Sequence, residues 1–149
     1  MNIKFKKLND NAVMPIRQHE SDAAYDLIVP EDTTIYPGGN IIKLNFAMQL
    51  PLGYGGYIKG RSGMDAKGIP DIYDIRHESA KVISGLVDAG YRDCVGVIVY
   101  NDGPREFKVK AGLRIAQMMI LKCYTPDFVE VDSLDESDRS GGFGSTGTR

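Results

Sequence analysis

The segment Gly60-Arg61-Ser62-Gly63 combines groups that bind a phosphate or another oxyanion. The guanidinium of Arg61 carries a permanent charge, the hydroxyl of Ser62 donates a hydrogen bond, and the first turn of a following helix offers free backbone N–H groups. The sequence predicts such a helix over residues 62–67, with Ser62 as N-cap and Gly68 ending it. An N-capped surface helix with a solvated arginine explains the same residues, so both interpretations stand at this point.

A second candidate anion-binding element is the C-terminal segment 139–149. Its glycines let backbone amides approach a ligand closely, Ser145 and Thr146 donate hydroxyl groups, and Arg139 adds charge. Phe143 is its one large apolar residue and is suited to cover a planar base. The segment cannot form a core, and ordering it costs about 1–2 kcal/mol per residue, so we expect a mobile arm. A disordered tail without a ligand is the alternative.

Two carboxylates stand where they can do chemistry. Asp88 follows an apolar strand pattern and precedes Tyr91 by three residues in the turn of a predicted hairpin, so it is a candidate general base. Turns also recruit aspartate for backbone reasons alone. Asp26 lies inside an apolar strand pattern, where burial is costly unless the acid is paired or works near a metal. A structural salt bridge, with Arg114 as a partner, is the alternative for Asp26.

The elements that position these residues are predicted to be short strands. The chain has 149 residues, enough for one domain, and its 17 glycines and 7 prolines interrupt the sequence frequently. Strands are predicted over residues 41–48 and 94–100, and a turn at 101–104 leads toward 107–109 in a predicted hairpin. Residues 114–122 fit a buried strand or a buried helix, and we assign a strand. The sequence therefore predicts an all-β fold.

Charge and composition exclude several classes of function. The formal net charge is −2 and no five like charges are adjacent, which argues against a surface that binds nucleic acid. The two cysteines, Cys94 and Cys123, form no CxxC pair, and with only two histidines the chain has no zinc-ligand cluster. No apolar run approaches the ~20 residues that cross a bilayer, and the N-terminus lacks a signal core. We expect a cytoplasmic protein without a membrane partner.

Five segments, in this order along the chain, resemble the five motifs of the trimeric dUTPase family. They are Ala23-Ala24-Tyr25-Asp26-Leu27, Gly60-Arg61-Ser62-Gly63-Met64, Gly85-Leu86-Val87-Asp88-Ala89-Gly90-Tyr91-Arg92, Gly112-Leu113-Arg114-Ile115-Ala116-Gln117 and Gly141-Gly142-Phe143-Gly144-Ser145-Thr146-Gly147. The resemblance implies a jelly-roll-like distorted β-barrel with one short helix and a mobile C-terminal arm. It also implies a homotrimer with shared active sites and Mg²⁺-assisted hydrolysis of dUTP to dUMP and pyrophosphate, which keeps uracil out of DNA and supplies dUMP.

The resemblance implies a role for each matching residue. Asp88 would activate the water that attacks the α-phosphate, and Tyr91 would lie beneath the deoxyribose. Backbone groups at Gly85 and Gly96, on the two arms of the predicted hairpin, would read the uracil. Asp26 would meet Mg²⁺ through water, with the metal held mainly by the substrate phosphates. The remaining substrate-binding residues would be Arg61, Ser62, Gly63, Gln117, Arg139, Phe143, Gly144, Ser145 and Thr146.

The same resemblance divides the chain into a β domain over residues 1–138 and an arm over 139–149 that closes the active site. An insert at about 70–80 has no counterpart in the family pattern and is a surface excursion or an element that binds a protein partner. The tail between Arg139 and Phe143 is shorter than usual, so the contact of Arg139 with the γ-phosphate stays open.

Four further positions depart from the family pattern. They are Ala24 for the usual Gly, Gly60 for the usual Pro, Asp65 in the helix near the phosphates, and Leu113 for the usual Asp. None of them removes a catalytic role. Two alternatives in function remain, a dCTP deaminase-type enzyme and a nucleotide-gated regulatory protein.

Overall fold

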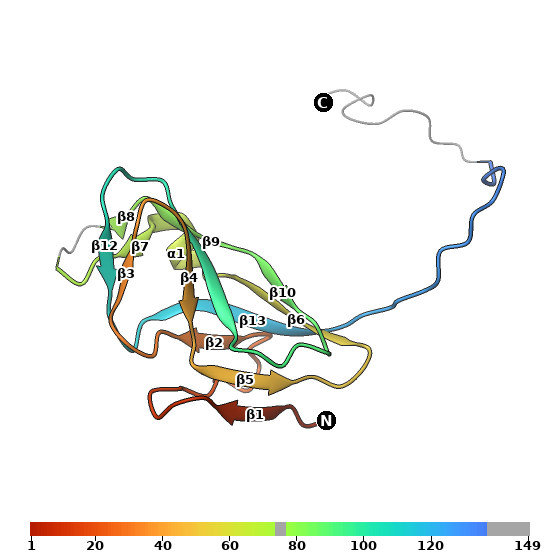
Figure 1. The fold of residues 1–149 in the computed structure, drawn as a ribbon, viewed down its shortest axis with the longest axis horizontal. Coiled ribbons are helices and arrows are strands. Elements are labelled where there is room, and N and C mark those ends of the chain that lie inside the picture. Colours follow the sequence, from red (N-terminus) through yellow and green to blue (C-terminus); the bar gives the residue numbers. More distant parts are fainter. Residues whose placement is uncertain (74–76, 137–149) are drawn as a thin grey trace.

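A computed structural model describes residues 1–73 and 77–136 of the chain (Figure 1). Thirteen strands and one short helix lie in this part of the chain. In chain order they are β1 (Lys4–Lys7), β2 (Tyr25–Ile28), β3 (Thr33–Ile35), β4 (Gly38–Lys43), β5 (Phe46–Gln49), β6 (Tyr54–Gly60), α1 (Ser62–Lys67), β7 (Ile69–Pro70), β8 (His77–Glu78), β9 (Ala80–Ile83), β10 (Gly85–Val87), β11 (Gly96–Asn101), β12 (Phe107–Val109) and β13 (Arg114–Lys122).

The strands form two principal antiparallel sheets and three two-stranded ladders. One principal sheet has the order β10-β6-β13-β2 and the other has the order β4-β11-β9. The ladders are β1-β5, β12-β3 and β7-β8. Within the described residues the strands are not joined into one closed barrel, and the arrangement is compatible with a jelly roll. The prediction of an all-β fold with one short helix is confirmed.

The core follows the alternation that a half-buried strand requires. In β11 the side chains of Val97 and Val99 are fully buried, whereas those of Ile98 and Tyr100 are partly exposed. The largest fully buried side chain is Phe46, whose ring centroid lies 5.0 Å from that of Phe5. The short strands are therefore held by side chains on one face, as period-2 patterning predicts.

The predicted strand over residues 41–48 is two strands in different sheets. β4 ends at Lys43 and β5 begins at Phe46, and between them Asn45 has a φ of 59°, a left-handed conformation that Asn tolerates better than most residues. The apolar pattern is uninterrupted because both strands face the same core, so the break is invisible to periodicity. The assignment of residues 114–122 as a strand is confirmed by β13.

The predicted hairpin between β11 and β12 is wrong. The turn itself forms, since the Gly103 N–H donates to Asn101 Oδ1 at 2.9 Å. However, β12 pairs with β3, in the register Phe107↔Ile35. The reason is that β11 already has β4 on one edge and β9 on the other up to Asn101, so the returning chain must pair elsewhere.

The insert at residues 70–80 begins and ends in ordered structure. β7 and β8 pair, with Ile69 opposite Glu78. The N–H of Ile72 donates to the Lys108 carbonyl at 2.7 Å, which ties this side of the insert to β12. Residues 74–76 lie outside the described part, so the two interpretations of the insert are not separated.

Beyond β13 the chain leaves the rest of the molecule as an extended segment, residues 123–136, seen in blue in Figure 1. Its large apolar side chains are exposed, and Phe128 is completely so, with a relative exposure of 104%. The others are Tyr124, Val129, Val131 and Leu134. In the described residues we find no helix that is long and apolar enough to cross a membrane.

Candidate active site

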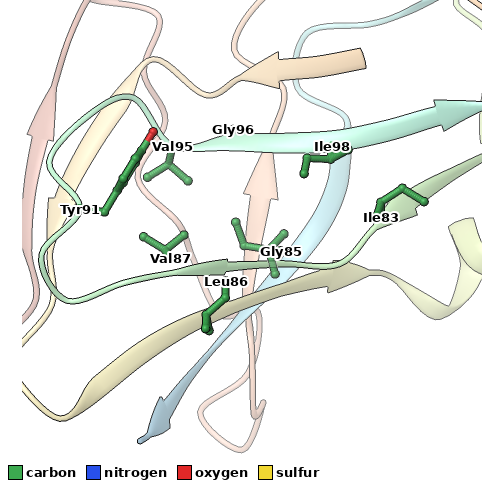
Figure 2. Close-up of a pocket in the computed structure, with 9 residues that line it drawn as sticks. Ile83, Gly85, Leu86, Val87, Tyr91, Val95, Gly96 and Ile98 are labelled. Atoms are coloured by element: carbon green, nitrogen blue, oxygen red, sulfur yellow. The ribbon is translucent and has the colours of Figure 1, made fainter. Parts of the chain in front are cut away.

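A pocket of about 210 Å³ lies between β10 and β11; we call it the apolar pocket (Figure 2). Its lining comprises Ile58, Ile83, Gly85, Leu86, Val87, Tyr91, Val95, Gly96 and Ile98. The sequence predicted β10 and β11 as the arms of a hairpin, but they belong to different sheets and no ladder joins them. Because the two arms do not pair with each other, backbone groups on the facing edges stay available to a ligand.

Tyr91 is fixed at one end of the apolar pocket. Its hydroxyl donates to the Cys94 carbonyl at 2.9 Å, and its N–H donates to the Asp88 carbonyl at 3.0 Å. Figure 2 shows the ring between the two arms, beside Val87 and Val95. The ring is therefore a rigid flat wall for whatever enters the pocket.

The surroundings of Gly85 and Gly96, the two predicted glycines of this pocket, differ in the space that they leave for a side chain. A Cβ at Gly96 would lie 2.7 Å from Ile41 Cγ2, so packing against β4 excludes a side chain there. A Cβ at Gly85 would have no heavy atom within 4 Å. The space beside Gly85 is open, and Gly85 lines the pocket.

Asp88 directly follows β10 and is exposed. Among the described residues, its carboxylate has no hydrogen-bond or ion-pair partner. It follows Val87, which lines the apolar pocket, and both its oxygens are open to water or a ligand.

A second cavity, the polar pocket, has a volume of about 550 Å³. It brings together five predicted site residues from three distant segments: Asp26, Arg61, Ser62, Gly63 and Gln117. The rest of its lining was not predicted as site residues and comprises Gln18, His19, Asp22, Ala23, Ala24, Lys59, Arg114 and Met119. Ala23, Ala24 and Arg114 belong to the first and fourth motifs, and the strand period from Gln117 identifies Met119 on the same face. Gln18, His19, Asp22 and Lys59 lie outside the five motifs.

Asp26 holds the polar pocket together. Arg61 Nε lies 3.0 Å from Asp26 Oδ1, and Arg114 Nη1 lies 3.3 Å from Oδ2. Gln18 Nε2 also donates to Oδ2, at 3.3 Å. The carboxylate is only 11% exposed, so the two ion pairs and the hydrogen bonds from Arg114 and Gln18 compensate its burial. The structural salt bridge with Arg114 is thus present, and Arg61 shares it.

The helix beside the polar pocket differs from the prediction at its first residue. Arg61, not Ser62, occupies the N-cap position, and no side chain caps the helix. The hydroxyl of Ser62 is therefore not used as a cap, and Ser62 and Gly63 line the pocket. The predicted end is confirmed, since Gly68 has a φ of 87° and its N–H donates to Met64 O at 2.8 Å.

Asp65 does not line the polar pocket. Its carboxylate packs against Gly60, where an added Cβ would lie 2.6 Å from Asp65 Cγ. It lines a smaller neighbouring cavity together with Lys59 and Lys81. Asp65, which the sequence placed near the phosphates, thus lies outside the lining of the polar pocket. Gly60 leaves space for its carboxylate because it has no side chain.

The two pockets have separate linings on the sheet β10-β6-β13-β2. Ile58 lines the apolar pocket and Lys59, the next residue of β6, lines the polar pocket. Successive side chains of a strand point to opposite faces, and the two linings share no residue. Neighbouring positions of β6 thus contribute to two different pockets.

Some predicted site residues cannot be placed. Those in the C-terminal segment lie outside the described residues: Arg139, Phe143, Gly144, Ser145 and Thr146. Within residues 1–73 and 77–136, no group of three His, Cys, Asp or Glu side chains is arranged to hold a metal ion.

Comparisons with known proteins agree on one family. A family model described as dUTPase matches residues 10–147. The deoxyuridine 5'-triphosphate nucleotidohydrolase of Arabidopsis thaliana is 42% identical over 146 residues, which cover 97% of this chain and 82% of the plant protein.

Two solved phage structures are also similar. A mutant dUTPase of Staphylococcus bacteriophage 80alpha, with dUpNHpp, has a TM-score of 0.85 at 27% identity, covering 99% of each chain. A mutant dUTPase from phage phi11 of S. aureus, described with a structural Mg(II) ion, has a TM-score of 0.77 at 24% identity, covering 89% of this chain and 98% of that one. Because the family model spans nearly the whole chain and includes both pockets, this protein belongs to the dUTPase family.

Proposed function

We propose that this protein hydrolyses dUTP to dUMP and pyrophosphate, keeping uracil out of DNA and supplying dUMP. The observation that carries the proposal is the polar pocket, where distant segments bring a guanidinium, a hydroxyl and a side-chain amide together. That set of donors fits a chain of phosphates. Membership of the dUTPase family identifies the nucleotide as dUTP.

The apolar pocket is suited to the base and sugar of dUTP. A volume of about 210 Å³ suits a pyrimidine with its sugar beside it, and the facing backbone edges of the pocket include Gly85 and Gly96. Hydrogen bonds from these edges would read the uracil, and close walls would exclude the methyl group of thymine. The ring of Tyr91 would lie against the deoxyribose and leave no room for a 2′-hydroxyl.

Asp88 acts as the general base in this proposal. It accepts a proton from a water molecule, the water oxygen forms a bond to the α-phosphorus, and the bond to the bridging oxygen breaks, so that pyrophosphate leaves. The carboxylate is exposed and has no ion-pair or hydrogen-bond partner within residues 1–73 and 77–136, which supports this role as proton acceptor. Arg61, Ser62, Gly63 and Gln117 hold the phosphate chain in line, which is most of what phosphoryl transfer requires of a protein.

The residues of the polar pocket fit a Mg²⁺ ion that arrives with the triphosphate. Mg²⁺ keeps several waters and binds through few carboxylates plus substrate phosphates. Asp26, with both oxygens already in ion pairs, would meet such an ion through water. When bound, the ion would neutralise charge on the phosphates.

We also propose a homotrimer with active sites shared between subunits. The separate linings of the two pockets support sharing, because a second copy can bring its apolar pocket to the polar pocket of the first. The exposed apolar side chains of residues 123–136 support association as well, since in water they favour burial. Residues 139–149 would then form an arm, outside the domain at 1–138, in which Phe143 covers the uracil and Ser145 and Thr146 close on the γ-phosphate.

The test is release of pyrophosphate from dUTP with Mg²⁺, beside dCTP, dTTP and UTP. We expect hydrolysis of dUTP alone, and a loss of at least about 100-fold in kcat for Asp88→Asn. Asp93→Asn is the matched control, because it removes an exposed acid from the same turn. Both variants should keep the wild-type melting temperature.

Three results would contradict the proposal. Ammonia release from dCTP would indicate a deaminase. Nucleotide binding without any hydrolysis by a folded protein would indicate a regulatory protein, for which the insert at 70–80 remains the predicted partner site. Equal activity of the two aspartate variants would remove Asp88 as the base.

A further inference from the structure

We infer that Lys59 is a further phosphate-binding residue, which contacts the triphosphate of the substrate. The inference rests on the proposed function. Neither the five motifs nor the predicted site residues include Lys59, and it precedes the second motif by one position.

The strand register places Lys59 on the face that carries the polar pocket. In the ladder between β6 and β13, Lys59 lies directly opposite Gln117. Gln117 in turn lies opposite Asp26 in the ladder between β13 and β2. Side chains that are directly opposite in an antiparallel sheet share a face and lie about 4.5–5.5 Å apart at Cβ. The three residues therefore form one row across the floor of the pocket.

The ion pairs of the pocket make Lys59 different from the two arginines. Arg61 and Arg114 are both engaged with Asp26, at 3.0 and 3.3 Å. Lys59 has no carboxylate within 4.0 Å among the residues that the structure describes. A triphosphate carries several negative charges, and the cation that is not already neutralised contributes most to binding it.

A structural role for Lys59 is the rival explanation. Lys59 also lines the smaller cavity that contains Asp65 and Lys81, so its charge could serve to balance Asp65. In that case Lys81, which lines the same cavity but not the polar pocket, would have a comparable effect. Comparing variants of Lys59 and Lys81 therefore distinguishes phosphate binding by Lys59 from a general role of positive charge beside Asp65.

The experiment compares wild type with Lys59→Met, Lys59→Arg and the control Lys81→Met. For each protein we would measure kcat and KM for dUTP with Mg²⁺, the dissociation constants of dUpNHpp and dUMP, and the melting temperature. For Lys59→Met we expect KM and the dUpNHpp constant to rise about tenfold, with kcat changed by less than about twofold. The dUMP constant should change less, because dUMP lacks two of the phosphates. Lys59→Arg should restore most of the affinity, and Lys81→Met should resemble wild type.

An unchanged dUpNHpp constant in Lys59→Met would overturn the inference. An equal effect of Lys81→Met would do the same, because it would assign the effect to general charge. If Lys59→Met lowers the melting temperature strongly, Lys59→Gln repeats the comparison with a polar side chain. Absence of dUTP hydrolysis by wild type would overturn the proposed function instead, and the dUpNHpp constants would still decide the role of Lys59.

Discussion

At the scale of residues, Asp26 and Asp88 show how surroundings separate two carboxylates. Asp26 is nearly buried; its oxygens form ion pairs with Arg61 and Arg114 and accept hydrogen bonds from Arg114 and Gln18. Its lone pairs are used to hold the pocket in shape. Asp88 is exposed and has no partner in the described part of the chain. Only Asp88 is thus free to take a proton from water, although the sequence alone offers both acids.

Gly85 gives a prediction at the same scale. Its Cβ position is empty and faces the apolar pocket, so Gly85→Ala should fold normally. The added methyl group would occupy space that the base needs, and we expect KM for dUTP to rise at least about tenfold. Gly39→Ala is the control, since that Cβ is also unobstructed but lies outside both pockets. Equal kinetics for the two variants would show that the base binds elsewhere.

At the scale of elements, Gly60 and Asp65 join the end of β6 to helix α1. The carboxylate of Asp65 occupies the place where a side chain at position 60 would begin. The helix has six residues, too few to be stable by itself, so this contact and the C-terminal turn at Gly68 help to fix its direction. Two departures from the family pattern, the glycine and the acid, are therefore one coupled change.

This coupling can be measured by a double-mutant cycle. Gly60→Ala should lower the free energy of unfolding by about 1–3 kcal/mol, because the methyl group overlaps the carboxylate. Asp65→Ala alone should have a small effect, and Asp65→Ala in the Gly60→Ala background should recover most of the loss. Urea denaturation gives the four free energies of unfolding. Additive losses, within about 0.5 kcal/mol, would show that the two positions are independent.

At the scale of the whole molecule, the two pockets have separate linings. β6 contributes Ile58 to one and Lys59 to the other. In the proposed homotrimer, dUTP lies between two copies of the chain, with the apolar pocket of one beside the polar pocket of the other. Under this proposal, association of copies is a requirement of catalysis rather than only a source of stability.

Complementation between two inactive variants tests this requirement. Asp88→Asn removes the general base beside the apolar pocket, and Arg61→Gln removes a cation from the polar pocket. Each variant alone should therefore be nearly inactive. If sites are shared, co-assembly in equal amounts should restore about a quarter of the wild-type activity, because that share of interfaces pairs two intact halves. Light scattering of the mixture gives the mass of the assembly. No recovery by mixed assemblies would place the whole site within one chain.

The sequence by itself determined the class of fold and indicated the candidate site residues. Short segments in which apolar and polar residues alternate, separated by glycine and proline, predict strands. This alternation every two residues is a local property of the sequence. β13 and the end of α1 lie where that local chemistry places them. The glycines, acids and cations of the five motifs are also local patterns, and five of these residues meet in one pocket.

Only the tertiary structure decided which strands pair and what the pairing leaves open. β12 pairs with β3 because β11 has no free edge at its Asn101 end, and β4 and β5 separate at Asn45 although the apolar pattern continues. The same choices split β10 from β11 and open the apolar pocket. Pairing depends on contacts between residues far apart in the chain, and no local pattern contains them. For that reason the row that joins Lys59 to Gln117 and Asp26 appears only in the folded sheet.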